Sequence, residues 1–188
     1  MERALKVLSV LFASIFGYIF VALSLFVAVE TLGRKLFNYS LQGADELGGY
    51  ALAVGSSLAF TVALIERAHI RIEMLHRLLP RLARTLLNWL SIVLIAAFGV
   101  LIVWVCATIL ADTLEYHSTA PTPWATPLIW PQGFWYGGLM IFAVLATILA
   151  LRATFLLASG RHDDLDRIYG PKEAREEIAE ELEDLARR

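Results

Sequence analysis

The sequence predicts an all-α membrane protein with four transmembrane helices, short interfacial helices and a charged cytoplasmic C-terminal helix. Three observations support this fold class. Four apolar stretches are each long enough to cross a hydrocarbon core, which takes about 20 helical residues. Apolar residues make up 58% of the chain and the mean hydropathy is +0.63, whereas a soluble domain is roughly 45–50% apolar. Basic residues gather on one side of the stretches.

The four predicted spans are about 7–29, 47–65, 86–110 and 133–157. The first has no Asp, Glu, Lys, Arg or His, and it is longer than the roughly 7–15 apolar residues of a signal peptide, so we expect a retained helix. We predict a four-helix transmembrane domain over residues 1–160 and a charged cytoplasmic tail over residues 161–188. The single cysteine, Cys106, excludes an intrachain disulfide and a CxxC metal or redox pair.

The distribution of Lys and Arg predicts which side of the membrane each connection faces. The connection after the second span carries five arginines, whereas residues 112–132 carry no Lys or Arg. Because cytoplasmic loops retain positive charge, we expect the N-terminus, the second connection and the C-terminus to be cytoplasmic. The first connection, which holds only Arg34 and Lys35, and the third should face the opposite compartment.

The three connections and the tail have different patterns. The first connection alternates charged and apolar residues, which favours an interfacial helix or turn. In the second, apolar residues recur at three- and four-residue spacing and predict an amphipathic surface helix that ends before Pro80. The third has four prolines and two tryptophans, so it cannot be one regular helix. In the tail, Pro171 can begin a helix, and both a solvated tail and a partner-binding helix remain open.

The spans lack the groups that carriers use. Carriers of ions or polar solutes bury ionisable groups near the midplane or break a helix there, and none of the four spans does either. Their main polar residues are serine and threonine, which more often serve helix packing. The chain is therefore predicted to be a scaffold that needs a partner. No serine nucleophile motif, phosphate loop or nucleic-acid stripe is evident.

Two groups of side chains are candidate sites. Asp45 and Glu46 are adjacent at the start of the second span, so on a helix their carboxylates point in different directions, and the macrodipole favours both. His69, Glu73 and His76 would share one helix face and could hold a metal ion. The arginines around these three residues oppose a cation. We predict no cofactor and no catalytic residue, and a membrane metalloenzyme using this face stays an alternative.

Three motifs flank the first two spans. They are Arg34-Lys35-Leu36-Phe37-Asn38 after the first span, Asp45-Glu46-Leu47 before the second, and Arg67-Ala68-His69-Ile70-Arg71-Ile72-Glu73-Met74-Leu75 after it. With the length, span count and topology, they resemble the small membrane subunit (Q-type, DctQ-like) of TRAP transporters, the tripartite ATP-independent periplasmic carriers. The resemblance covers roughly residues 7–157. This chain has Gly43-Ala44 where the family commonly has tryptophan before the acidic pair.

The resemblance implies a non-catalytic small permease subunit of a sodium-driven symporter for organic acid anions in the bacterial inner membrane. Its partners would be a large multi-span membrane subunit that it braces, a periplasmic solute-binding protein and membrane lipid, without nucleic acid. The expected subunit or lipid contacts are Arg34, Asp45, Glu46, His69, Arg71 and Glu73. For Arg71, a topology-setting charge at the lipid surface is the competing interpretation. The small subunit of another multi-component carrier is a further alternative.

Overall fold

In the part of the chain that the structure describes, four long helices and one short helix form. The computed structural model describes residues 2–40, 43–67 and 79–170. The helices are α1 (Glu2–Phe37), α2 (Ala44–Ile65), α4 (Arg81–Glu115), α5 (Ile129–Ala158) and α6 (His162–Tyr169), and these ranges contain no strand. All four long helices are long and apolar enough to cross a membrane. The predicted all-α membrane fold class is therefore confirmed, and each predicted span lies within one helix.

Two of the long helices extend well beyond the predicted spans. The 22 residues of α2 rise about 33 Å, close to the thickness of a hydrocarbon core. In contrast, α1 has 36 residues and α4 has 35. The segment expected to be an interfacial helix or turn begins as the last turn of α1, which continues through Arg34 and Lys35 and ends at Phe37, and it finishes as the first turn of α2, which begins at Ala44. The predicted surface helix before Pro80 and the predicted helix after Pro171 lie outside the described residues.

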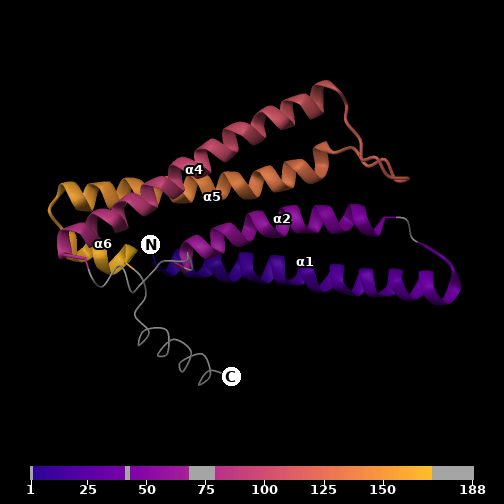
Figure 1. The fold of residues 1–188 in the computed structure, drawn as a ribbon, viewed down its shortest axis with the longest axis horizontal. Coiled ribbons are helices and arrows are strands. Elements are labelled where there is room, and N and C mark those ends of the chain that lie inside the picture. Colours follow the sequence, from indigo (N-terminus) through magenta and orange to yellow (C-terminus); the bar gives the residue numbers. More distant parts are fainter. Residues whose placement is uncertain (1, 41–42, 68–78, 171–188) are drawn as a thin grey trace, which may run out of the picture.

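The long helices pack side by side in the order α1, α2, α5 and α4, as Figure 1 shows. Half of the most apolar window of α5 is buried in the chain, compared with 6% for α1. The buried core joins α4, α5 and α6 and includes Ile92, Phe142, Ala146 and Leu165. Helix α5 is therefore the centre of the bundle and α1 is its edge.

Glycines allow the helices to approach closely at three places. A Cβ atom at Gly138 of α5 would collide with the side chain of Ser57 in α2. In the same way, Gly55 of α2 accommodates the ring of Phe20 in α1, and Gly99 of α4 lies against α5. Small residues at such contacts are typical of helix packing in membranes, where close backbone approach supplies much of the attraction.

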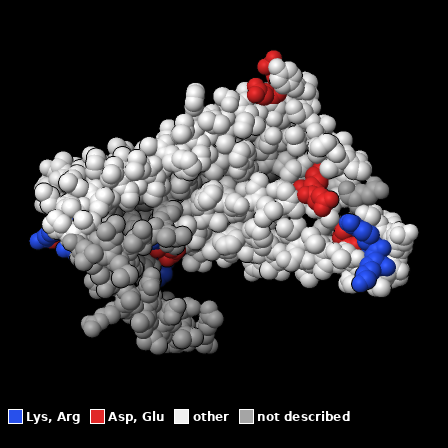
Figure 2. All heavy atoms as spheres, in the orientation of Figure 1, with Lys and Arg blue, Asp and Glu red and all other residues white. Residues whose placement is uncertain are grey.

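The two ends of the bundle differ in structure. We call the end that holds α6 the α6 end, and the opposite end, with Phe37, Gly43 and the connection 116–128, the loop end. Figure 2 shows the described Lys, Arg, Asp and Glu at these two ends of the visible face, with an uncharged band between them. This band is what a hydrocarbon core requires, because charged side chains at its centre are costly.

The connection 116–128, which we call the hairpin loop, is ordered although it is not helical. Thr119 and Pro127 form an isolated antiparallel bridge. The amide of Ala120 donates to the carbonyl of Thr126 over 2.9 Å, and the amide of Leu128 donates to the carbonyl of Ser118 over 3.0 Å. These bonds fold the proline-rich segment back on itself, in agreement with the prediction that it cannot be a regular helix.

Candidate functional site

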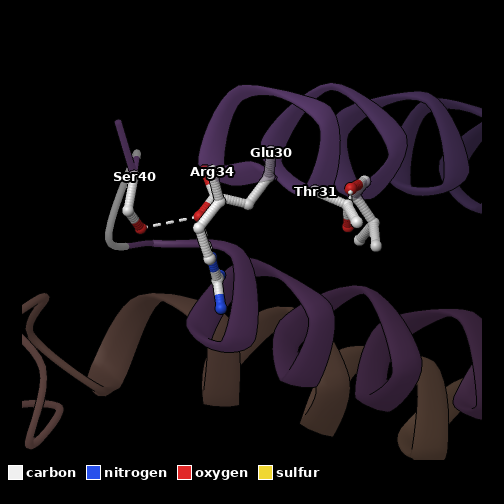
Figure 3. Close-up of polar contacts among 5 residues, drawn as sticks. Glu30, Thr31, Arg34 and Ser40 are labelled. Carbon is white, nitrogen blue, oxygen red and sulfur yellow. Dashed lines mark hydrogen bonds and ion pairs between the residues drawn. The ribbon is translucent and has the colours of Figure 1, made fainter. Parts of the chain in front are cut away.

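A buried carboxylate near the loop end of α1 was missed by sequence reasoning. Glu30 is only 2% exposed, and its Oε1 accepts hydrogen bonds from Arg34 over 2.8 Å and from Ser40 over 2.7 Å. Figure 3 shows Glu30 and Arg34 on successive turns of α1, with the Ser40 hydroxyl directed at the carboxylate. Glu30 follows the first predicted span directly, and its spacing of four residues from Arg34 is the signal that could have found the pair.

The motif that begins at Arg34 now has a structural explanation. Arg34 neutralises Glu30 with one nitrogen, while its side chain remains 63% exposed. Asn38 has a φ of 52°, which is the left-handed conformation that asparagine tolerates better than most residues and that commonly ends a helix. The motif therefore closes α1 and turns the chain toward α2, and the exposed part of Arg34 is free to meet a partner.

The two adjacent acids of α2 are in different environments, as the helical geometry predicts. Glu46 is 6% exposed. Its Oε1 accepts a hydrogen bond from the Tyr50 hydroxyl over 2.8 Å, and its Oε2 accepts one from the hydroxyl of Thr122 in the hairpin loop. Asp45 is exposed. Within the described chain, Glu46 thus fastens the hairpin loop to α2, whereas Asp45 is available at the surface.

An aromatic contact reinforces this attachment. The indole of Trp124 in the hairpin loop lies so close to Gly43 that a Cβ atom there would collide with it. The family resemblance leads us to expect a tryptophan just before the acidic pair, where this chain has Gly43 and Ala44. In this chain an indole reaches the start of α2 from a distant segment, which no local sequence pattern reveals.

At the α6 end, α6 is bound to α4 by side-chain hydrogen bonds. The Asp166 carboxylate accepts from the Thr85 hydroxyl over 2.7 Å and from the Asn88 amide over 2.9 Å. Leu165 is fully buried in the core beside them. Asp163, on the same helix, forms an ion pair with Arg81 at the start of α4. Helix α6 therefore closes the α6 end of the pair formed by α4 and α5.

Two further bonds connect α6 to the rest of the bundle. The buried Tyr169 hydroxyl donates to the carbonyl of Leu149 in α5 over 3.0 Å. Burial raises the pKa of Tyr169, while the charge of Arg152 opposes the shift, so the phenol is protonated and able to donate at neutral pH. Arg67, just after α2, donates to the carbonyl of Arg167 over 3.0 Å.

The other predicted site residues cannot be placed in the same way. His69, Arg71, Glu73 and His76 lie outside the described residues. Among residues 2–40, 43–67 and 79–170, no group of three His, Cys, Asp or Glu could hold a metal ion. The metal alternative and the contact role of the segment after α2 therefore stay predictions.

Between the two ends, the buried polar groups serve helix packing. Ser57 and Thr61 of α2 are fully buried, and the Ser57 hydroxyl donates to the carbonyl of Val54 in its own helix over 2.8 Å. In an exposed contact, the Trp89 indole of α4 donates to the Thr154 hydroxyl of α5 over 3.0 Å. These features define a multi-pass membrane protein whose described polar contacts hold its own helices together.

Comparison with known families agrees with this class. The family model described as "Tripartite ATP-independent periplasmic transporters, DctQ component" matches residues 23–159, well over half of the chain. The chain belongs to this family and is a small permease component of a TRAP transporter, as the motifs around the first two spans predicted. No curated protein and no solved structure matches the chain. Helix α6 begins after the last residue matched by the family model.

Proposed function

We propose that the chain braces the large membrane subunit of a sodium-driven TRAP transporter for organic acid anions. The observation that carries the bracing role is the attachment of α2 at both of its ends. At the loop end, Glu46 binds Thr122 of the connection between α4 and α5. At the α6 end, Arg67 binds the carbonyl of Arg167. These bonds oppose movement of the pair α1 and α2 relative to the pair α4 and α5, which suits a stationary support.

The composition of the four spans supports the proposal that a partner subunit binds the solute and the ion. No Asp, Glu, Lys, Arg or His lies near the centre of the four spans, and Arg152, the one arginine within them, lies near the α6 end of α5. Sodium and carboxylate sites in carriers need charged side chains or interrupted helices at the midplane. The large subunit would supply those groups, and a periplasmic binding protein would deliver the solute.

The proposal includes an orientation in the bacterial inner membrane, with the α6 end in the cytoplasm and the loop end in the periplasm. It follows from the arginines at the α6 end and from the lack of Lys and Arg in residues 112–132. In a Cys106→Ala background, a membrane-impermeant maleimide applied to intact spheroplasts should label Lys35→Cys and leave Ser159→Cys unlabelled. The reverse labelling pattern would contradict the orientation.

Uptake by reconstituted vesicles tests the function. Vesicles that contain this chain and its large membrane subunit, supplied with the binding protein and a labelled organic acid, should accumulate the acid under an inward sodium gradient. Omission of any one component should abolish accumulation. Undiminished uptake without this chain would refute the bracing role, and undiminished uptake without sodium would refute the coupling ion.

A further inference from the structure

One exposed side chain does not suit contact with lipid. Tyr18 lies at the middle of the apolar run 7–29, eleven residues from either end, and hence about 16 Å of helix from each boundary. It is 77% exposed, and its hydroxyl has no hydrogen-bond partner among the residues that the structure describes. Helix α1 is the edge of the bundle (Figure 1). The exposure of Tyr18 places its side chain on the outer face of this helix.

A phenol at this depth would be costly in pure hydrocarbon. Tyrosine is enriched at membrane interfaces because its ring is apolar while its hydroxyl reaches water or a headgroup. At the midplane neither is within reach of the side chain. An unpaired hydroxyl buried in an apolar medium loses its hydrogen bonds without compensation. A hydrogen-bond acceptor from another molecule would remove this cost.

Three other exposed polar residues of the spans do not need such a partner, because each bonds within its own helix. Ser14 and Ser56 each donate to the carbonyl four residues earlier in their own helix, and Thr108 donates to the carbonyl of Val105. The Tyr18 hydroxyl, at the far side of a ring, cannot bond in this way. Trp104 of α4 is also exposed, but it lies six residues from the end of the predicted span 86–110, nearer the boundary where indoles are common.

Exposed residues above and below Tyr18 form a continuous stripe. They recur at alternating spacings of three and four residues along the face of α1 that is directed away from α2, and they are Val7, Leu11, Ser14, Tyr18, Val21 and Leu25. This spacing suits side-by-side packing with a further helix. By contrast, the outward stripe of α5 carries only large apolar side chains around its middle, at Val144, Ile148 and Leu151, which suits lipid.

We propose that the α1 face centred on Tyr18 packs against a transmembrane helix of the large subunit, which offers a hydrogen-bond acceptor to the Tyr18 hydroxyl. This inference rests on the proposed function and adds to it which edge of the bundle meets the partner. The acceptor is a backbone carbonyl or a polar side chain at the midplane. The exposed faces of α4 and α5 are left to lipid.

Removal of one oxygen atom tests the contact. Tyr18→Phe should raise the dissociation constant of the two subunits about 3- to 30-fold, the range expected for one hydrogen bond between membrane helices. The measurement is fluorescence energy transfer between labelled subunits in lipid vesicles. Tyr116→Phe is the matched control, because Tyr116 is similarly exposed, at 72%, but lies at the loop end, and it should leave the constant unchanged.

Photocrosslinking independently identifies the molecule that contacts the α1 face centred on Tyr18. With p-benzoylphenylalanine in place of Tyr18, irradiation of the complex should join this chain to the large subunit, whereas the same replacement of Ile148 should capture lipid. Crosslinking of position 148 to the large subunit, with position 18 crosslinked only to lipid, would overturn the inference. A dissociation constant of Tyr18→Phe equal to that of the wild type would also overturn it. Either result would leave the proposed function intact, whereas wild-type subunits that do not associate would refute both.

Discussion

Among the described residues, the carboxylates of Glu30, Glu46 and Asp166 are each bonded by two side chains that take the place of water. Glu30 is bonded by Arg34 and Ser40, Glu46 by Tyr50 and Thr122, and Asp166 by Thr85 and Asn88. Donors of this kind replace the hydration that a carboxylate loses near an apolar core. Each carboxylate fixes the segment that supplies its donors. In this chain, acidic residues beside the spans therefore act as attachment points.

The attachment of the hairpin loop can be tested at Glu46. Glu46→Ala removes the acceptor for Tyr50 and Thr122, so we expect a lower thermal unfolding temperature in detergent and faster proteolysis within residues 116–128. Asp45→Ala is the matched control, since Asp45 is the adjacent acid and is exposed. If both variants behaved alike, Glu46 would not hold the loop.

The attachment of α6 depends on Asp166. Asp166→Asn replaces an acceptor of two hydrogen bonds, and hydrogen bonds to a charged group are each worth roughly 1.5–3 kcal/mol. We expect destabilisation of about that size and early cleavage near α6 in limited proteolysis. Asp164→Asn, which breaks only the exposed local pair with Arg161, should cost less than about 1 kcal/mol. Equal effects of the two changes would contradict the structural role of Asp166.

The buried phenol of Tyr169 predicts a pH dependence at the alkaline side. Its pKa lies above the ordinary value of 10.0 because burial disfavours the phenolate. The contribution of the protonated Tyr169 phenol to the free energy of unfolding is therefore complete below pH 10, and it is lost as pH rises through the raised pKa of the folded state. Unfolding temperatures of the wild type and Tyr169→Phe should thus converge at high pH. A constant difference between them up to pH 11.5 would show that Tyr169 ionises equally in both states.

At the scale of helices, hydropathy was sufficient to locate the spans but not the ends of the helices. The helix α1 continues past Val29 because Glu30 is neutralised within the chain by Arg34, a compensation that hydropathy does not register. The short helix α6 was assigned only to a charged tail, since most of its side chains are polar. Its position depends on Leu165, Asp166 and Tyr169, whose partners lie far away in sequence.

The contact between α2 and α5 provides a test at this scale. Gly138→Ala would place a methyl group against Ser57, so we expect destabilisation of about 1–3 kcal/mol from overpacking. Gly137→Ala is the adjacent control, because a Cβ atom there meets nothing within 4 Å. Alanine also favours the helix, so this control should be neutral or slightly stabilising. Destabilisation of both variants to the same degree would argue against a close α2–α5 contact. The measurement is unfolding in detergent followed by circular dichroism.

At the scale of the whole molecule, sequence motifs identified the family before any contact was known. Asp45 and Glu46 were correctly expected to diverge, because adjacent residues on a helix point in different directions. The contacts of Glu46 with Thr122 and of Gly43 with Trp124 could not be foreseen, because they join segments about 80 residues apart in sequence. Such pairings depend on how α2 packs on α5.

The bundle leaves a large apolar surface uncovered, most of all on α1. The chain belongs to a tripartite transporter family, and we propose that part of this surface docks on the large membrane subunit. The attachment of α2 at both ends opposes movement between the helices that form this apolar surface. This attachment supports the proposal that the chain is a rigid support within a larger transport unit.

Co-purification tests this account most directly. The chain should be expressed together with the large membrane subunit from the same genome, extracted in mild detergent and purified through a tag on the large subunit. We expect the two chains to elute as one complex at a fixed ratio through size-exclusion chromatography. Separate elution of two well-folded proteins, each with its helical spectrum intact, would contradict the central claim.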